Sequence, residues 1–299
     1  MKLWLGGAGL ILMALAAAFG PGLWPEDPRS IHLARSLLPP GPECPLGCDS
    51  NGTDILAILL HGARLSLFVG GVTTAACTAI ALLLGSFAAW SGGRRDASVR
   101  WLLDVVFAFP GILLAIALAS MMGPSLGNVV LCLVLTGWAG LTRIVRGEVM
   151  SIRHREFVEA ARALGLSTPR ILVFHVWPNL LPTVFVASTF GFASVVVSEA
   201  SLSFLGVGIP AGTPSWGALL SSGKSFLLEA PHIAAAPGVA LMFTVLALNL
   251  LGEGLREWLD ARVAGGSYLH QRLRDGDTFS IGLIEFRVMH TPGHTPEHI

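Results

Sequence analysis

The chain has 299 residues, of which 53% are hydrophobic and only 13% are charged, and its formal net charge is zero. With a mean hydropathy of +0.68, it has too few charged residues to cover a water-facing surface, which excludes an ordinary soluble protein. The neutral total also gives no support to nucleic acid as a partner, because phosphate backbones are bound by basic faces.

The first apolar stretch runs from Leu3 to Phe19 and follows Lys2. Its length is that of a short membrane helix. The alanines at positions 16–18 also resemble the small-residue site at which a signal peptide is cleaved. Because further apolar stretches follow, we interpret this one as a retained membrane anchor in preference to a cleaved signal.

The next segment, residues 20–61, is rich in proline and glycine, and its piece from Ile31 to Leu38 has an amphipathic pattern. We expect this outer segment to lie against the outer face of the membrane. Cys44 and Cys48 could form a disulfide if the segment faces an oxidising compartment. Alternatively, Pro45 and the short loop could hold the two thiols apart.

Four further apolar stretches predict five more membrane helices. Leu65 to Trp90 has no charged residue and predicts one span. Val105 to Thr142 has none either, but it is too long for one helix, and the turn-forming sequence from Gly123 to Asn128 divides it in two. The remaining spans are Pro182 to Leu205 and Ile233 to Gly252, which makes six in all.

The basic residues predict how these spans are oriented. If the N-terminus is cytoplasmic, twelve Lys and Arg residues fall on the cytoplasmic side, and four fall on the opposite side: Arg29, Arg35, Arg64 and Lys224. Positively charged residues favour the cytoplasmic side of a membrane. We therefore expect a multi-pass protein of the cytoplasmic (inner) membrane, surrounded by the lipid bilayer, with a cytoplasmic N-terminus.

The longest predicted cytoplasmic connection, residues 147–181, contains two helical patterns. The first favours a helix that ends at Gly165, because glycine is common just past a helix end. Thr168 is a good N-cap and Pro169 suits the first position of a second helix. Two short helices joined by a sharp turn would form a rigid, exposed elbow.

This connection looks more like a docking element than a solvated loop. Ala160 and Ala161 are small enough to let another element pack closely. Apolar residues outside the bilayer favour a contact with a partner, and the connection holds five of them: Phe157, Leu164, Leu166, Ile171 and Phe174.

Charged residues in or near the spans are costly and are candidates for a transport path. Glu199 lies near the far end of the fifth predicted span. It could line the outer vestibule or gate, or it could be a helix-end carboxylate that reaches water. Asp104 and Arg143 lie near the cytoplasmic ends, where snorkelling explains them. Phe109-Pro110 predicts a helix kink and not a substrate site.

Part of this connection, residues 147–181, resembles a known signature, which in that family marks the coupling loop. Glu159-Ala160-Ala161, three residues, Gly165, nine residues and then His175-Val176-Trp177-Pro178 resemble the Glu-Ala-Ala-x3-Gly-x9-Ile-x-Leu-Pro signature of ATP-binding cassette (ABC) importer permeases. This chain has His175 and Trp177 where the signature has Ile and Leu. The resemblance implies that the loop, through Glu159, Ala160, Ala161, Gly165 and Pro178, docks on an ATP-hydrolysing subunit.

Further motifs are similar to the dipeptide, oligopeptide and nickel branch of these permeases, over roughly residues 1–263. They include His61–Leu67, Glu199–Gly206, Thr213–Gly217 and Asn249–Arg256. The resemblance implies an all-α permease fold that translocates short peptides by alternating access, or alternatively nickel or another small solute, without catalytic chemistry or a cofactor of its own. It also implies three kinds of partner: ATP-binding subunits, a second permease subunit and an extracytoplasmic solute-binding protein.

The composition changes after Ala264. The sequence His290-Thr-Pro-Gly-His294-Thr-Pro-Glu-His298 resembles a metal-ligand segment of the metallo-β-lactamase superfamily, in which His294 would be a ligand. The His-x-His-x-Asp-His motif of that superfamily is absent from the sequence, and residues 265–299 are too few to build its core. We expect a non-functional fragment with a short β-hairpin, and keep a membrane-tethered metallohydrolase as the alternative function from a different class.

The sequence therefore predicts three parts. Residues 1–64 hold the N-terminal membrane helix and the outer-face segment. Residues 65–263 form the permease domain, with the coupling loop at 147–181. Residues 264–299 form the truncated metallo-β-lactamase-like fragment.

Overall fold

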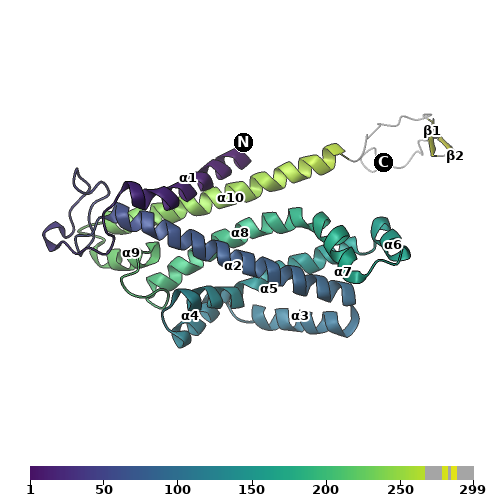
Figure 1. The fold of residues 1–299 in the computed structure, drawn as a ribbon, viewed down its shortest axis with the longest axis horizontal. Coiled ribbons are helices and arrows are strands. Elements are labelled where there is room, and N and C mark those ends of the chain that lie inside the picture. Colours follow the sequence, from purple (N-terminus) through teal and green to yellow (C-terminus); the bar gives the residue numbers. More distant parts are fainter. Residues whose placement is uncertain (267–277, 282–283, 288–299) are drawn as a thin grey trace, which may run out of the picture. The chain divides into compact units, whose positions relative to one another are not determined.

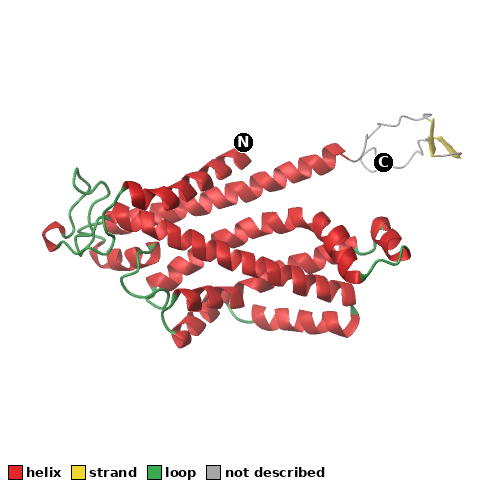
Figure 2. Cartoon of the chain, viewed as in Figure 1, coloured by secondary structure: helices red, strands yellow, loops and turns green. Residues whose placement is uncertain are grey.

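The computed structural model describes the backbone of residues 1–266, 278–281 and 284–287, and the side-chain surroundings of residues 1–260. The chain forms two compact units, Met1–Trp258 and Leu259–Ile299. The first unit is a bundle of helices (Figures 1 and 2). One end of the bundle carries the loop between the first two helices, and the other end carries the short helices α6 and α7, Glu156–Ala163 and Thr168–Ile171.

Among the described residues, five long helices have the length and apolar composition of membrane spans. They are α1 (Lys2–Leu23), α2 (Ile55–Ser91), α5 (Leu126–Ile152), α8 (Trp177–Phe204) and α10 (His232–Gly266). The shorter elements, besides α6 and α7, are α3 (Gly93–Phe107), α4 (Gly111–Met122), α9 (Trp216–Gly223), the 3₁₀ turns η1 (Leu33–Arg35) and η3 (Lys224–Phe226), and the π-helical stretch η2 (Leu172–Val176).

The third predicted span is a bent pair of helices. α3 and α4 meet at an angle of 81°, and counting them as one broken span brings the number of candidate spans to six. At 1.5 Å per residue, the 12 residues of α4 extend only about 18 Å, which is too short to cross a bilayer alone. The break falls at Phe109-Pro110, as predicted, and α4 ends at Met122, before the predicted turn.

The central helix of the bundle is α2, which packs against α1, α5, α8 and α9. It begins at Ile55, not at Leu65 as predicted, so the predicted domain boundary between residues 64 and 65 lies inside it. The Asp54 carboxylate caps the helix by accepting the Leu56 N–H at 2.7 Å. Arg64 does not interrupt the helix, because its guanidinium donates to the Ala18 carbonyl of α1 at 2.7 Å.

The loop between α1 and α2 contains a disulfide between Cys44 and Cys48, whose Cα atoms are 6.0 Å apart. Of the two alternatives for this pair, the disulfide is therefore the one that the structure has, and Pro45 does not hold the thiols apart. Both cysteines are fully buried. The predicted amphipathic piece contains the single turn η1, and Ile31 and Leu33 are exposed. The Trp24 indole donates to Asp54 at 2.9 Å, which ties the end of α1 to the start of α2.

α1 packs as a member of the bundle, beside α10 (Figure 1). A Cβ atom on Gly6 would clash with the backbone nitrogen of Leu251, so the two helix backbones lie in close contact there. At the N-terminal end of α1, the Lys2 ammonium lies 3.0 Å from Glu253 and 2.8 Å from Glu257. Close packing and these ion pairs together hold α1 against α10.

In the second unit the structure describes two strands, β1 (Thr278–Ile281) and β2 (Ile284–Arg287). They pair antiparallel, with Thr278 opposite Arg287 and Ile281 opposite Ile284. This pairing is a local feature of a short segment.

Candidate functional site

The elbow, residues 153–178, follows α5 and comprises α6, α7, η2 and the first two residues of α8. α6 ends just before Gly165, whose φ is +76°. The Gly165 N–H donates to the Arg162 carbonyl at 2.9 Å, and the Leu166 N–H donates to the Ala161 carbonyl at 3.2 Å. These two hydrogen bonds form a Schellman turn. The predicted helix end at Gly165 is confirmed.

Two details of the elbow differ from the prediction. The helix before Gly165 is interrupted, because α5 ends at Ile152 and α6 begins only at Glu156. The second helix begins at Thr168, which makes Ser167 the N-cap in place of Thr168. The Thr168 hydroxyl is used elsewhere, since it accepts a hydrogen bond from the Trp90 indole at 3.3 Å.

A π-helical joint connects the elbow to α8. The Trp177 N–H donates to the carbonyl of Leu172, five residues earlier, in place of the usual four. Pro178 follows and has no N–H to donate, so a regular α-helical hydrogen bond cannot form at that position. The predicted site residue Pro178 therefore lies where the elbow passes directly into a membrane helix.

The elbow is held on the end of α2 by polar and aromatic contacts. The Arg162 guanidinium lies 4.4 Å from the centre of the Trp90 ring. Arg153 donates to the Ala89 carbonyl at 2.5 Å, and the Trp177 indole donates to the Ser86 hydroxyl at 3.0 Å. These contacts join three separate points of the elbow to the last two turns of α2.

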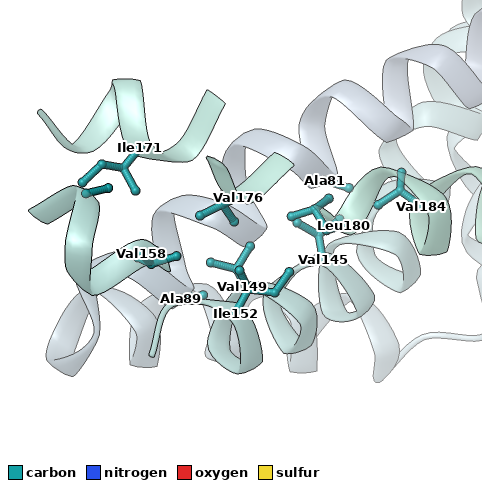
Figure 3. Packing of buried hydrophobic residues seen from close by; sticks show 11 residues of the cluster. Ala81, Ala89, Val145, Val149, Ile152, Val158, Ile171, Val176, Leu180 and Val184 are labelled. Carbon is teal, nitrogen blue, oxygen red and sulfur yellow. The ribbon is translucent and has the colours of Figure 1, made fainter. Parts of the chain in front are cut away.

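A buried apolar cluster lies beneath these contacts (Figure 3). Val158 of α6, Ile171 of α7 and Val176 of η2 meet Ala89 of α2 and Ile152 of α5 there. Ile171 therefore serves this core, so the prediction that it contacts a partner is wrong. The half-buried Leu166 packs against the same core. Burial of such side chains makes the elbow continuous with the bundle.

α3 is tied to α5 by a paired ion bridge near the elbow. Arg146 places Nε 2.5 Å from Asp96 Oδ1 and Nη2 2.8 Å from Oδ2, which is bidentate geometry. Arg100 adds a second ion pair to Asp96 at 3.3 Å. Asp96 and Arg146 are 50 residues apart in the sequence, so no local pattern predicts that they pair.

The free surface of the elbow combines apolar, small and acidic residues. Leu164 is 81% exposed, Phe174 is 68% exposed and Phe157 is 37% exposed. Glu159 and Ala160 are also exposed, and Glu159 makes no ion pair within the part of the chain that the structure describes. Ala161 is different, since only 4% of it is exposed and it packs in the apolar cluster.

Glu199 lies inside the bundle. Its side chain is 0% exposed. One carboxylate oxygen accepts the Ser66 hydroxyl of α2 at 3.0 Å, and the other accepts the Ser203 hydroxyl of α8 at 2.9 Å. The carboxylate ties α8 to α2, and its burial contradicts the interpretation as a helix-end carboxylate that reaches water. Its predicted role in the outer vestibule or gate stays a prediction.

This position gives a direct test of the role of Glu199. In Glu199→Ala, the hydroxyls of Ser66 and Ser203 lose their acceptor, so the variant should be less stable by about 1–3 kcal/mol. Thermal unfolding of the detergent-purified protein measures this. A pathway role would instead lower transport while the unfolding temperature stayed at its wild-type value, and that result would contradict the structural role.

The described residues contain no group of three or more His, Cys, Asp or Glu side chains arranged to hold a metal ion. The predicted ligand His294 and its neighbours His290 and His298 lie outside the described residues.

Most of the chain is similar in sequence to known proteins. Residues 81–265 match the family described as binding-protein-dependent transport system inner membrane component. The chain is 36% identical to a dipeptide transport system permease protein of Alkalihalophilus pseudofirmus, over 85% of each protein. It is 37% identical to a glutathione transport system permease protein of Escherichia coli, over 86% of this chain and 85% of that protein.

A putative peptide transport system permease protein of Brucella suis is 36% identical, over 85% of this chain and 86% of its own length. Among solved structures, a chain of the MetNI methionine ABC transporter in an inward-facing conformation superposes with a TM-score of 0.56. The superposition covers 67% of this chain and 95% of the MetNI chain, at 18% sequence identity. At that identity, the likeness to the MetNI chain concerns the fold alone.

Proposed function

Because the chain belongs to the family of binding-protein-dependent transport system inner membrane components, we propose that it is the permease subunit of an ATP-driven importer of short peptides in the cytoplasmic membrane. The relatives named above are permeases of peptide, dipeptide and glutathione transport systems. A membrane permease is not itself an enzyme, so ATP is hydrolysed on a separate partner subunit.

The exposed elbow is the observation that carries this proposal. Its free surface, with Phe157, Glu159, Ala160 and Leu164, is the docking surface for an ATP-binding subunit. Large apolar side chains outside the spans have no lipid to cover them, and a partner protein removes them from water. The elbow is also anchored well enough to transmit a push, because Arg162 and Trp177 hold it to α2.

The same contacts supply a route for alternating access. Closure of the ATP-binding subunits would displace the elbow and tilt α2 through Trp90 and Ser86. The displacement would pass to α8 through η2, and to α3 through Asp96 and Arg146. Hydrogen bonds from Trp90 to Thr168 and from Trp177 to Ser86 join α2 to the elbow. The ion pair of Asp96 and Arg146 joins α3 to α5, and η2 continues directly into α8.

The charges support the orientation that we propose. Basic residues gather around the elbow, including Arg153, Arg155, Arg162 and Arg170, and the positive-inside rule favours the cytoplasm for this end of the bundle. The loop with the disulfide then faces the oxidising side. One bundle supplies half of a path, so we include a second permease subunit and an extracytoplasmic solute-binding protein as partners.

Cross-linking tests the docking surface with a matched pair of variants. A cysteine at the exposed Ala160 should form a cross-link to the ATP-binding subunit in native membranes, and a cysteine at the buried Ala161 should not. The natural cysteines interfere little, because Cys77 and Cys132 are buried and the other two are joined in the disulfide.

Immunoblotting and mass spectrometry identify the captured protein. Capture of no nucleotide-binding protein at position 160, in membranes that carry out uptake, would refute the docking role.

A further inference from the structure

Three cavities lie along one face of α8, within the part of the bundle that the structure describes. The first, of about 330 Å³, lies between α2, α5 and α8. The second, of about 260 Å³, lies between α4, α5 and α8, and the third, of about 400 Å³, lies between α4, α8 and α10. Ser194 lines all three, and Ser198 lines the second and third. The cavities therefore adjoin along a single row of α8 residues.

The hydroxyls of Ser194 and Ser198 differ from other hydroxyls in the membrane helices. Thr78, Ser120, Thr136, Thr142, Ser201 and Thr244 each donate to the carbonyl four residues earlier in their own helix. Ser194 and Ser198 make no hydrogen bond to any described residue. Thr74 also lines the first cavity, and its hydroxyl is buried without a hydrogen-bond partner among the described residues.

An unpartnered hydroxyl that faced lipid would find nothing to bind, because the hydrocarbon core offers neither donors nor acceptors. Ser194 is exposed in this chain, and it shares its face with Ser198 and Ser201. This face is therefore suited to border water or a polar ligand. The residues that line the three cavities also include no charged side chain.

We propose that Ser194 and Ser198 are cargo-contacting residues of the transport path, and that this path recognises the backbone amides of a peptide without discriminating by side-chain charge. The inference rests on the proposed function and deepens it. A hydroxyl can donate to a peptide carbonyl or accept from a peptide N–H, so two of them serve any peptide in either direction.

Because no charged residue lines the three cavities, peptides of different charge should bind there with similar strength. In a low-dielectric site, a fixed charge would hold a cargo of opposite charge tightly and exclude one of like charge. Release on the far side requires that binding inside the path stays weak. Neutral hydroxyls meet that requirement for cationic, neutral and anionic peptides alike.

Uptake by the intact transporter, with all its native partner subunits, tests the inference with three labelled dipeptides: Ala-Ala, Lys-Ala and Glu-Ala. The double variant Ser194→Ala with Ser198→Ala should lower uptake of all three by about fivefold or more, as expected for lost hydrogen bonds. Ser194→Asp should raise the ratio of Lys-Ala to Glu-Ala uptake by about tenfold over wild type.

Ser120 gives the matched control, because its hydroxyl donates to the Ile116 carbonyl of its own helix at 2.8 Å. Ser120→Ala and Ser120→Asp should leave both the rates and the ratio close to wild type. The amount of partner subunit that co-purifies with each variant is measured in parallel, so that assembly is separated from transport.

Two results would overturn the inference. One is unchanged uptake and an unchanged charge ratio in the Ser194 and Ser198 variants of a transporter that imports these peptides. The other is loss of the second permease subunit from Ser194→Asp, which would make this face a subunit contact. If the wild-type transporter imports none of the three dipeptides, the proposed peptide function itself fails.

Discussion

Gly165→Val should abolish uptake while the protein stays in the membrane, and Gly165→Asn should keep most of it. The φ of +76° is costly for an ordinary L-residue, by about 1–2 kcal/mol, and more for a β-branched one. Asparagine tolerates this conformation. No atom lies within 4 Å of a Cβ built at this position, so the backbone conformation, and not a clash, separates the two variants.

The measurement is initial uptake of a labelled dipeptide, normalised to the amount of variant in purified membranes. Loss of the Schellman turn would rotate α6 away from α7 and misplace Glu159 and Ala160. Wild-type uptake by the valine variant would show that the turn is not needed for coupling. Equal loss in the valine and asparagine variants would show that the position contacts a partner directly.

The second large effect is expected at the contact between α1 and α10. Gly6→Leu should lower the unfolding temperature in detergent by about 5 °C or more, because a side chain there overpacks against the backbone of Leu251 and Ala247. Gly7→Leu is the matched control, since nothing lies within 4 Å of a Cβ at that position. Both variants add the same side chain to the same helix.

Fluorescence-detected size-exclusion chromatography after heating measures the shift. Equal unfolding temperatures for the two leucine variants would contradict the packing of α1 against α10. A shift confined to Gly6→Leu would show that α1 contributes to the stability of the bundle.

Much of the fold could be predicted from apolar length, because a membrane helix must satisfy its own backbone. α8 contains nearly all of the predicted span from Pro182 to Leu205, and α10 begins within one residue of its predicted start but continues past the predicted end at Gly252 to Gly266. The turn before α5 falls where glycine and proline interrupt the apolar run. α2 begins ten residues before the predicted start at Leu65, because the charged Arg64 lies inside the helix and does not end it. In the structure, carbonyls at the end of α1 receive its guanidinium.

The candidate site was predictable in outline and not in detail. Gly165 marked the turn because few residues suit a left-handed conformation. The inward position of Ala161 could have been found from helical spacing, since Val158, three residues earlier, points into the same cluster. The partners of Trp90, Asp96 and Glu199 are far away in sequence, and no local pattern predicts them.

The length of α2 has a consequence for the two faces of the bilayer. Its 37 residues extend about 55 Å at 1.5 Å per residue, from the disulfide-containing loop to the elbow. In the proposed alternating-access mechanism, this unbroken helix would act as a lever, because tilting it by about 5° shifts one tip by roughly 5 Å relative to the other. A displacement beside Asp54 would then reach Trp90 without crossing a joint, which would make simultaneous opening at both faces mechanically difficult.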